Sequence, residues 1–330
     1  MGLVRREFLQ GALAAASTIA FPSCEAARAQ SYPARPIRVI VPVAAGGPVD
    51  VITRTIVQKV CERLGSQFHV ENIPTGAGNV ATGAGAKAAP DGHTLLAVTT
   101  ALSINPSLYN KLPYEPVRDF SPLTLVATSP HVLVVNPALP AADLKELVRL
   151  VRNSPGKYSY ASPGAGQSGQ LAGEMFRLAC GLDLAHVPFN GAIPAITATV
   201  AGHTQIAVMS LAAAAGSIKD AKLRALAVTS AKRSNVFPNI PTMAEMDIAG
   251  QESAFWQGIV FPAGTSREII DRWYREVVTI VALPEVQSRL DAMSFEPVAN
   301  APAEFAAVIK TEISKWRGVI ESAGMQKLDN

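Results

Sequence analysis

The chain has 330 residues, of which 48% are hydrophobic and 17% charged, and its formal net charge at pH 7 is +3. A charge this small excludes the strongly basic surface of a nucleic-acid-binding protein, so we expect no nucleic-acid partner. The length predicts roughly two domains of about 150 residues each, with enough apolar side chains to form a sizeable core.

The first residues have the pattern of an export signal. Arg5 and Arg6 precede a short apolar run that ends at Phe21, and a charged segment before an apolar one is typical of secretory signals. The paired arginines resemble a twin-arginine signal. A membrane anchor is the alternative, but the run is short for a membrane span, which needs about 20 residues.

The small residues of Ala27–Ala29 predict cleavage of this signal before Gln30. Residues 1–29 are therefore interpreted as a signal peptide, and the mature protein is expected in the periplasm. Its formal charge falls to +2, because three arginines and two glutamates leave with the signal. A lipid anchor at Cys24 is a second alternative, but the residues around Cys24 make a poor acylation sequence.

Predicted strands and helices alternate along the mature chain. The run at 36–43 predicts a buried strand, and the apolar spacing from Ile52 to Leu64 predicts the helix that follows. Further apolar runs predict strands at residues 67–72, 94–100, 158–162, 185–189, 205–210 and 223–230. Helical patterns occur at residues 143–154 and 170–180. Such alternation is typical of an α/β fold with mainly parallel sheets.

Two long extended runs indicate crossings between two lobes. They lie at residues 123–137 and 253–264, and each follows an irregular loop that contains proline. We therefore predict that residues 30–128 and 252–330 form one lobe and that residues 129–251 form a second lobe inserted into the first. A cleft between two lobes is a preferred place for a ligand.

Small residues recur where a predicted strand runs into a helix. This pattern occurs five times, as AAGGPVD (44–50), TGAGN (75–79), TTALS (99–103), SPGAGQSGQ (162–170) and FNGAIPA (189–195). Glycine leaves backbone N–H groups uncovered, and the start of a helix adds positive potential. Together they predict a site for a small carboxylate or phosphate that needs no lysine or arginine.

Two segments of the sequence partly match motifs of other kinds of site. The segment GAGNVA (76–81) matches a dinucleotide-binding turn, but Thr99 and Thr100 stand where that site needs an acidic residue. The segment GQSGQ (166–170) is one residue short of the G-x-S-x-G turn of serine hydrolases. An exported hydrolase with Ser168 as nucleophile is therefore the alternative function, although no histidine and aspartate are obvious partners.

Metal ions and cofactors have little support in the sequence. The five histidines are scattered, and neither H-x-x-x-H nor C-x-x-C occurs. We expect no metal and no cofactor. Cys61 and Cys180 each lie in an apolar helical pattern, so we expect two buried thiols rather than a disulfide.

Several segments, taken in order, resemble one known family. They include YPARPIRVIVPVAAGGPVDVITR, VENIPTGAGN, APDGHTLL, YSYASPGAGQSGQLAGEMF, HVPFNGAIPAI and WQGIVFPAGT. In this order they resemble the periplasmic solute-binding receptors of tripartite tricarboxylate transporters, often called Bug proteins. The resemblance covers essentially the whole mature chain. It implies the type II periplasmic-binding-protein fold, with two α/β lobes joined by two extended hinge segments.

The resemblance also implies where a ligand would bind. In the family, a P-x-x-x-G-G-x-x-D loop, here Pro42 to Asp50, and a second loop, here Ser162 to Gln170, hold a ligand carboxylate between the lobes. Asp50 either accepts a hydrogen bond from the ligand, orders the helix start, or serves as a helix cap alone. The candidate ligand-binding residues are Ala45, Gly46, Gly47, Asp50, Thr99, Thr100, Ser162, Gly164, Gly166, Gln167, Ser168, Gln170, Asn190, Gly191 and Ser210.

Two departures from the family pattern bear on the ligand. Family members commonly have a histidine where this chain has Gln170, and P-Y-K-G where it has Pro188 to Gly191. A lysine and a tyrosine hydroxyl are therefore missing from one wall, which favours a ligand with one carboxylate and an apolar or aromatic body. The expected partners are the membrane subunits of a transporter, with a sensor as the alternative, and we expect a monomer that is not an enzyme.

Overall fold

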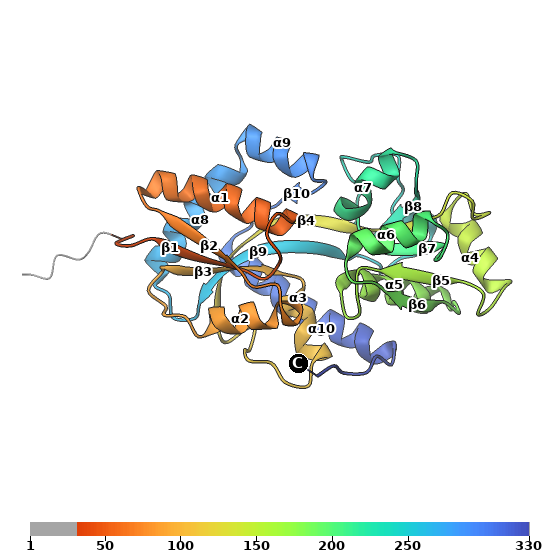
Figure 1. The fold of residues 1–330 in the computed structure, drawn as a ribbon, viewed down its shortest axis with the longest axis horizontal. Helices are drawn as coiled ribbons and strands as arrows, with labels where there is room; N and C mark the ends of the chain where they lie inside the picture. Colours follow the sequence, from red (N-terminus) through yellow and green to blue (C-terminus); the bar gives the residue numbers. More distant parts are fainter. Residues whose placement is uncertain (1–31, 330) are drawn as a thin grey trace, which may run out of the picture.

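The computed structural model describes residues 32–329 and shows two lobes side by side, joined by long strands (Figure 1). The architecture is mixed α/β, as the alternating sequence pattern predicts. The predicted signal peptide at residues 1–29 and its cleavage before Gln30 lie outside the described residues.

Lobe I is built on parallel strands in the order β2-β1-β3. Strand β1 is mostly apolar because both its faces are covered, with Val39 in one apolar core and Ile40 in another. The lobe begins with β1 (Ile37–Val41), α1 (Pro48–Leu64), β2 (Phe68–Asn72), η1 (Gly76–Gly78), α2 (Asn79–Ala86), β3 (Thr94–Thr99) and α3 (Ala101–Leu108). Its later elements are α8 (Arg267–Val281), α9 (Pro284–Ala292), β10 (Glu296–Pro297) and α10 (Pro302–Ser322).

Lobe II repeats this plan with parallel strands in the order β6-β5-β7. Its elements are α4 (Leu144–Arg152), β5 (Ser159–Ser162), α5 (Ser168–Cys180), β6 (Ala185–Pro188), α6 (Ala192–Val200), β7 (Ile206–Ser210), α7 (Leu211–Lys219), β8 (Arg224–Val228) and η2 (Ala244–Met246). Local chemistry fixes the helix ends. Asp143, for example, caps α4 by accepting the N–H of Glu146 at 2.8 Å.

Two antiparallel strands cross between the lobes, β4 (Phe120–Val135) and β9 (Ala254–Pro262). They pair with each other up to Pro130 and Ala254, and at the next residue β4 joins β7. Strand β9 enters lobe I antiparallel to β3, and β4 enters lobe II antiparallel to β7. The parallel strands of each lobe therefore point their carboxyl ends at the other lobe.

Each lobe has its own apolar core. One core of lobe I surrounds Trp273, and one core of lobe II surrounds Phe176. The separation supports the division into residues 30–128 with 252–330 and residues 129–251, which we propose as the two domains.

The two cysteines within residues 32–329, Cys61 and Cys180, belong to different lobes. Cys61 packs in the lobe I core and Cys180 in the lobe II core, and both are buried and free. The expectation of two buried thiols is confirmed.

A further apolar cluster joins the lobes. It contains Leu108 of α3, Leu171 of α5 and Trp316 of α10, all buried. Helix α10 therefore packs against elements of both lobes. Among the described residues, no helix is long and apolar enough to cross a membrane.

Candidate functional site

The predicted site residues lie at the carboxyl ends of parallel strands, in one group on each lobe. Ligands of open α/β sheets bind at this edge. The lobe I group follows β1 and β3 and consists of Ala45, Gly46, Gly47, Asp50, Thr99 and Thr100. The lobe II group follows β5, β6 and β7 and consists of Ser162, Gly164, Gly166, Gln167, Ser168, Gln170, Asn190, Gly191 and Ser210.

The loop between β1 and α1 is held by Asp50, which is 2% exposed. The N–H of Gly46 donates to Asp50 Oδ2 at 2.9 Å. Asn72 Nδ2 donates to Oδ1 at 2.9 Å, and Arg54 Nε lies 3.0 Å from both oxygens. Burial acts to raise the pKa of Asp50, but these hydrogen bonds and the Arg54 charge outweigh it and lower the pKa below its ordinary value.

Asp50 therefore uses its carboxylate inside the protein, where it orders the turn that precedes the helix. Gly46 has a φ of 83°, which glycine adopts without strain. Gly47 is the N-cap of α1, and no side chain caps the helix. Because first-turn N–H groups have no partner within a helix, they remain as donors for an anion.

The loop between β5 and α5 has the same construction. Gly166 has a φ of 72°, and its N–H donates to Gln170 Oε1 at 2.7 Å. Gln167 is the N-cap of α5, again without a side-chain cap. A Cβ on Gly166 would lie 2.1 Å from Leu108 Cδ2 of lobe I, so this loop lies against the opposite lobe. The two loops differ in charge, since Asp50 is a carboxylate and Gln170 a neutral amide.

The correspondence continues in the neighbouring turns. Gly78 and Gly191 are the N-caps of α2 and α6, with φ values of 84° and 112°. The second residue of each helix is an exposed aliphatic side chain, Val80 at 52% and Ile193 at 78%. The lobes thus present matched turns at their facing edges.

Several candidate side chains in lobe II bond within their own lobe. Ser162 Oγ lies 2.7 Å from His186 Nε2 and accepts the N–H of Gly164 at 3.3 Å. The N–H of Gly191 donates to Pro163 O at 2.7 Å, which joins the FNGA turn to the β5–α5 loop. Burial lowers the pKa of His186, so this imidazole supplies no positive charge at neutral pH.

The remaining hydroxyl candidates stand at the starts of α3 and α7. Thr99 Oγ1 accepts the N–H of Ala101 at 3.4 Å, and Thr100 is the buried N-cap of α3. Ser210 is the N-cap of α7 and accepts the N–H of Ala213 at 3.4 Å. Thr99 and Ser210 therefore also order helix starts.

Ser168 has a histidine partner that the sequence did not indicate. His131 Nε2 lies 2.9 Å from Ser168 Oγ, whereas Nδ1 faces Ser253 Oγ at 3.1 Å rather than a carboxylate. His131 is fully buried, and burial, aided by the positive charge of Lys315, lowers its pKa to about 3. Such an imidazole cannot retain a proton taken from serine, and no carboxylate stabilises its charged form. The pair is a structural contact.

Sequence reasoning missed three other residues that shape the site: Arg54, Asn72 and Gln257. Arg54 follows Asp50 by four positions on one helix, a spacing that predicts an ion pair. Asn72 and Gln257 are distant in sequence, and no local pattern marks them. No cluster of His, Cys, Asp or Glu that could hold a metal occurs in the part of the chain that the structure describes.

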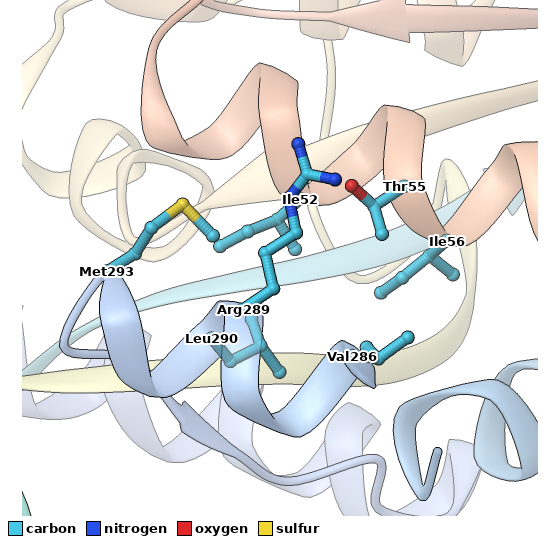
Figure 2. Close-up of a pocket in the computed structure, with 7 residues that line it drawn as sticks. All are labelled: Ile52, Thr55, Ile56, Val286, Arg289, Leu290 and Met293. Atoms are coloured by element: carbon cyan, nitrogen blue, oxygen red, sulfur yellow. The ribbon is translucent and has the colours of Figure 1, made fainter. Parts of the chain in front are cut away.

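A hollow between α1 and α9 lies apart from both groups of candidate residues. Figure 2 shows its lining by Ile52, Thr55, Ile56, Val286, Arg289, Leu290 and Met293. Its volume of about 10 Å³ has room for roughly one water molecule. It is too small for a carboxylate ligand.

Known proteins resemble this chain in sequence. Residues 52–325 match the family described as "Tripartite tricarboxylate transporter family receptor". A UPF0065 protein in the tcbD-tcbE intergenic region of Pseudomonas sp. strain P51 is 36% identical, covering 96% of this chain and 94% of that protein. Protein BugT of Bordetella pertussis is 32% identical, covering 98% and 99%.

Solved structures resemble it in fold. The R. palustris protein Rpa4515, with adipate, has a TM-score of 0.81 and 28% identity, covering 90% of this chain and 100% of that one. MatC from Rhodopseudomonas palustris, with bound malate, has a TM-score of 0.76 and 29% identity, covering 88% and 100%. Both share the two-lobed α/β architecture.

The fold is therefore that of a periplasmic binding protein, a class of receptors rather than enzymes. Within this class, the chain belongs to the tripartite tricarboxylate transporter receptor (TctC/Bug) family. It is a solute-binding receptor, which excludes the hydrolase alternative for Ser168.

Proposed function

We propose that the protein captures a small carboxylate between its two lobes in the periplasm and delivers it, chemically unchanged, to the membrane subunits of a transporter. The family and the adipate and malate in related structures support a carboxylate. The mature chain then begins at Gln30 and acts as a monomer.

The matched loops carry this proposal. On each lobe a glycine of positive φ gives its N–H to the side chain four residues later, Asp50 or Gln170. No side chain caps either of the helices that follow. Both helices follow parallel strands whose carboxyl ends point at the other lobe. Two uncapped helix starts, one on each lobe, would provide donors and positive potential for a carboxylate from both sides.

We further propose that the ligand has one carboxylate and an apolar body. The FNGA turn offers Phe189 and an exposed Asn190, and Ile193 next to it is largely exposed. Arg54, a cation beside the loops, is already paired with Asp50. Arg54 is therefore not a free cation for a second carboxylate on the ligand.

Thermal unfolding of residues 30–330 with a panel of acids tests both proposals. The panel contains acetate, benzoate, phenylacetate, amino acids, adipate, malate and citrate. A ligand of the native state stabilises it by about 2.7 kcal/mol at a hundredfold excess over its dissociation constant. We expect the largest shift from an aromatic or aliphatic monocarboxylate, recovered intact. Citrate or malate binding far better would overturn the ligand class, and a flat panel would count against the carboxylate proposal.

Gly46→Ala is the matching site variant, with Gly65→Ala as its control. Both glycines have positive φ and open space around the position of a Cβ, but Gly65 ends α1 away from the loop. Both variants incur similar backbone strain. Only Gly46→Ala is expected to abolish the ligand-induced shift.

Delivery to a transporter is tested in cells. Deleting the gene should abolish uptake of the labelled ligand. Expression of the full chain, with its signal, from a plasmid should restore uptake. Unchanged uptake with a lost transcriptional response to the ligand would instead establish a sensor. The mass of the exported protein checks the cleavage before Gln30.

A further inference from the structure

Each crossing strand carries a buried polar side chain that reaches one of the candidate ligand loops. His131 lies in β4, at the residue where this strand leaves β9 and joins β7. Gln257 lies within β9, between β3 and β4. Both are fully buried. Both ring nitrogens of His131 and the Nε2 of Gln257 make hydrogen bonds, whereas Gln257 Oε1 has no partner among the described residues.

His131 connects four segments of the chain. Its Nε2 contacts Ser168 Oγ at 2.9 Å, at the first residue of α5. Its Nδ1 contacts Ser253 Oγ at 3.1 Å, just before β9. Its backbone N–H donates to Thr229 Oγ1 at 2.9 Å, just after β8. The side chain therefore ties the start of α5 to both crossing strands.

Gln257 makes the equivalent connection in lobe I. Its Nε2 donates to Val49 O at 3.0 Å and to Thr53 Oγ1 at 2.8 Å. Thr53 Oγ1 in turn donates to Val49 O at 2.7 Å. Val49 is the second residue of α1, so β9 is tied to the first turn of α1 as β4 is tied to the first turn of α5.

We propose that His131 and Gln257 are positioning residues for ligand binding, each fixing the helix start behind one ligand loop to a strand that crosses between the lobes. For ligand affinity, this inference rests on the proposed function. When the lobes rotate about the crossing strands, each loop moves with the strand to which it is tied. The N–H donors of each lobe then keep their geometry as the lobes close.

The neutral imidazole suits this role. Burial holds the pKa of His131 at about 3, so one ring nitrogen donates and the other accepts. A leucine at this position fills similar space but bonds neither Ser168 nor Ser253. A glutamine retains a donor and an acceptor, so His131→Gln is the conservative variant that should rescue the contact.

Hydrogen exchange of the protein without ligand tests the positioning itself. His131→Leu is expected to raise amide exchange in residues 164–170 about tenfold while leaving residues 46–50 unchanged, and Gln257→Leu to do the reverse. Thr199→Val is the control, because it removes a buried hydroxyl within α6 that bonds Ala195 O and Thr204. It should change neither loop.

Affinity for adipate and benzoate, measured by calorimetry, gives the second readout. Ser168→Ala and His131→Leu should each weaken the binding of whichever acid the wild type takes up, by about tenfold. The double variant should bind no more weakly than His131→Leu alone, because that substitution already removes the contact with Ser168. His131→Gln should restore most of the affinity.

The outcomes separate positioning from mere stability and from the proposed function. If folded His131→Leu and Gln257→Leu show wild-type exchange in both loops, the inference is wrong. It is also wrong if these variants melt earlier but bind with dissociation constants within twofold of wild type. Should His131→Leu fail to fold, Ser168→Ala and His131→Gln answer the same questions. Failure of the wild type to bind any carboxylate counts against the proposed function, while the exchange measurement still decides the positioning role.

Discussion

Asp50 and Gln170 occupy equivalent positions in the two lobes but differ in charge. Each accepts the N–H of the glycine four residues earlier. The negative charge of Asp50 would repel a bound carboxylate, but the guanidinium of Arg54 neutralises it at 3.0 Å. Lobe I therefore presents an ion pair of no net charge behind its loop, and lobe II presents a neutral amide.

Asp50→Ala is expected to reduce both stability and affinity. Asn72, Arg54 and the Gly46 N–H all lose their acceptor, at a cost of about 1–3 kcal/mol in the free energy of unfolding. Affinity should fall because the turn is no longer ordered. Urea unfolding and calorimetry with the best ligand of the panel check the two effects. The structure already rules out the helix-cap interpretation of Asp50, because its carboxylate accepts the N–H of Gly46 and no side chain caps α1. Lower stability with unchanged affinity would restrict the role of Asp50 to the stability of this turn.

His131 makes stability depend on pH in mildly acidic solution. Its native pKa of about 3 lies below the ordinary value of 6.5, so below pH 6.5 the unfolded chain binds a proton that the native state does not. The free energy of unfolding therefore decreases as the pH is lowered from about 6.5 towards 4. For this one group the decrease is about 1.4 kcal/mol per pH unit.

His131→Gln should remove this part of the pH dependence. Urea unfolding at pH 7, 6 and 5 for both proteins measures it, and the other histidines and the carboxylates cancel in the comparison. Equal slopes of unfolding free energy against pH in the two proteins would contradict the assignment.

At the scale of single residues, the sequence predicted positions better than roles. The sequence predicts Gly46 and Gly166 in segments where a strand runs into a helix, and both have positive φ in the structure. The partners of Ser168 and of α1 were not predictable, because His131 and Gln257 reach them from strands far away in sequence. Only a local pair such as Asp50 and Arg54 leaves a pattern that spacing reveals.

At the scale of single elements, helix α5 packs closely at its first turn. A Cβ on Gly169 would lie 2.8 Å from Val208 O and 3.0 Å from Pro163 Cδ. The helix start therefore rests directly on the backbone of β7. This packing, together with His131, holds the second ligand loop in place.

Gly169→Ala should destabilise the protein by about 1–3 kcal/mol and weaken ligand binding, because the first turn of α5 must move away from β7. Gly216→Ala is its control. Gly216 lies in α7 with open space at the Cβ position, so alanine there should raise stability by up to about 1 kcal/mol. Thermal unfolding with and without ligand compares the two. Wild-type affinity in folded Gly169→Ala would show that the turn tolerates movement.

Most elements were predictable because strand and helix patterns are local. The runs at 36–43 and 205–210 contain β1 and β7, and the run at 253–264 contains β9. The run at 123–137 covers most of β4, which begins earlier, at Phe120. The matching of turns between the lobes was not predictable from the residues alone. It depends on the φ values of Gly46 and Gly166 and on the hydrogen bonds of their N–H groups. The two loops share these features although their sequences, AGGPVD and AGQSGQ, differ.

Over the whole molecule, α10 couples the lobes through the cluster around Leu171 and Trp316. Leu171→Ala should cost about 2–5 kcal/mol in the free energy of unfolding, because a fully buried side chain leaves a cavity. It should also separate the unfolding of lobe II from that of lobe I. Calorimetry is expected to show one transition in the wild type and a broadened or double one in the variant. A single sharp transition in both proteins would place the coupling in β4 and β9 alone.

The path of the chain through the lobes has a consequence for biosynthesis. The sheet of lobe I places β9 between β3 and β4, although β9 comes after every strand of lobe II. During translation, lobe II has all its strands before lobe I has β9, the strand that pairs with both β3 and β4. Lobe I can close only when residues 254–262 and the helices after them have left the ribosome. The lobe whose strands are made first is therefore the last to have its sheet complete.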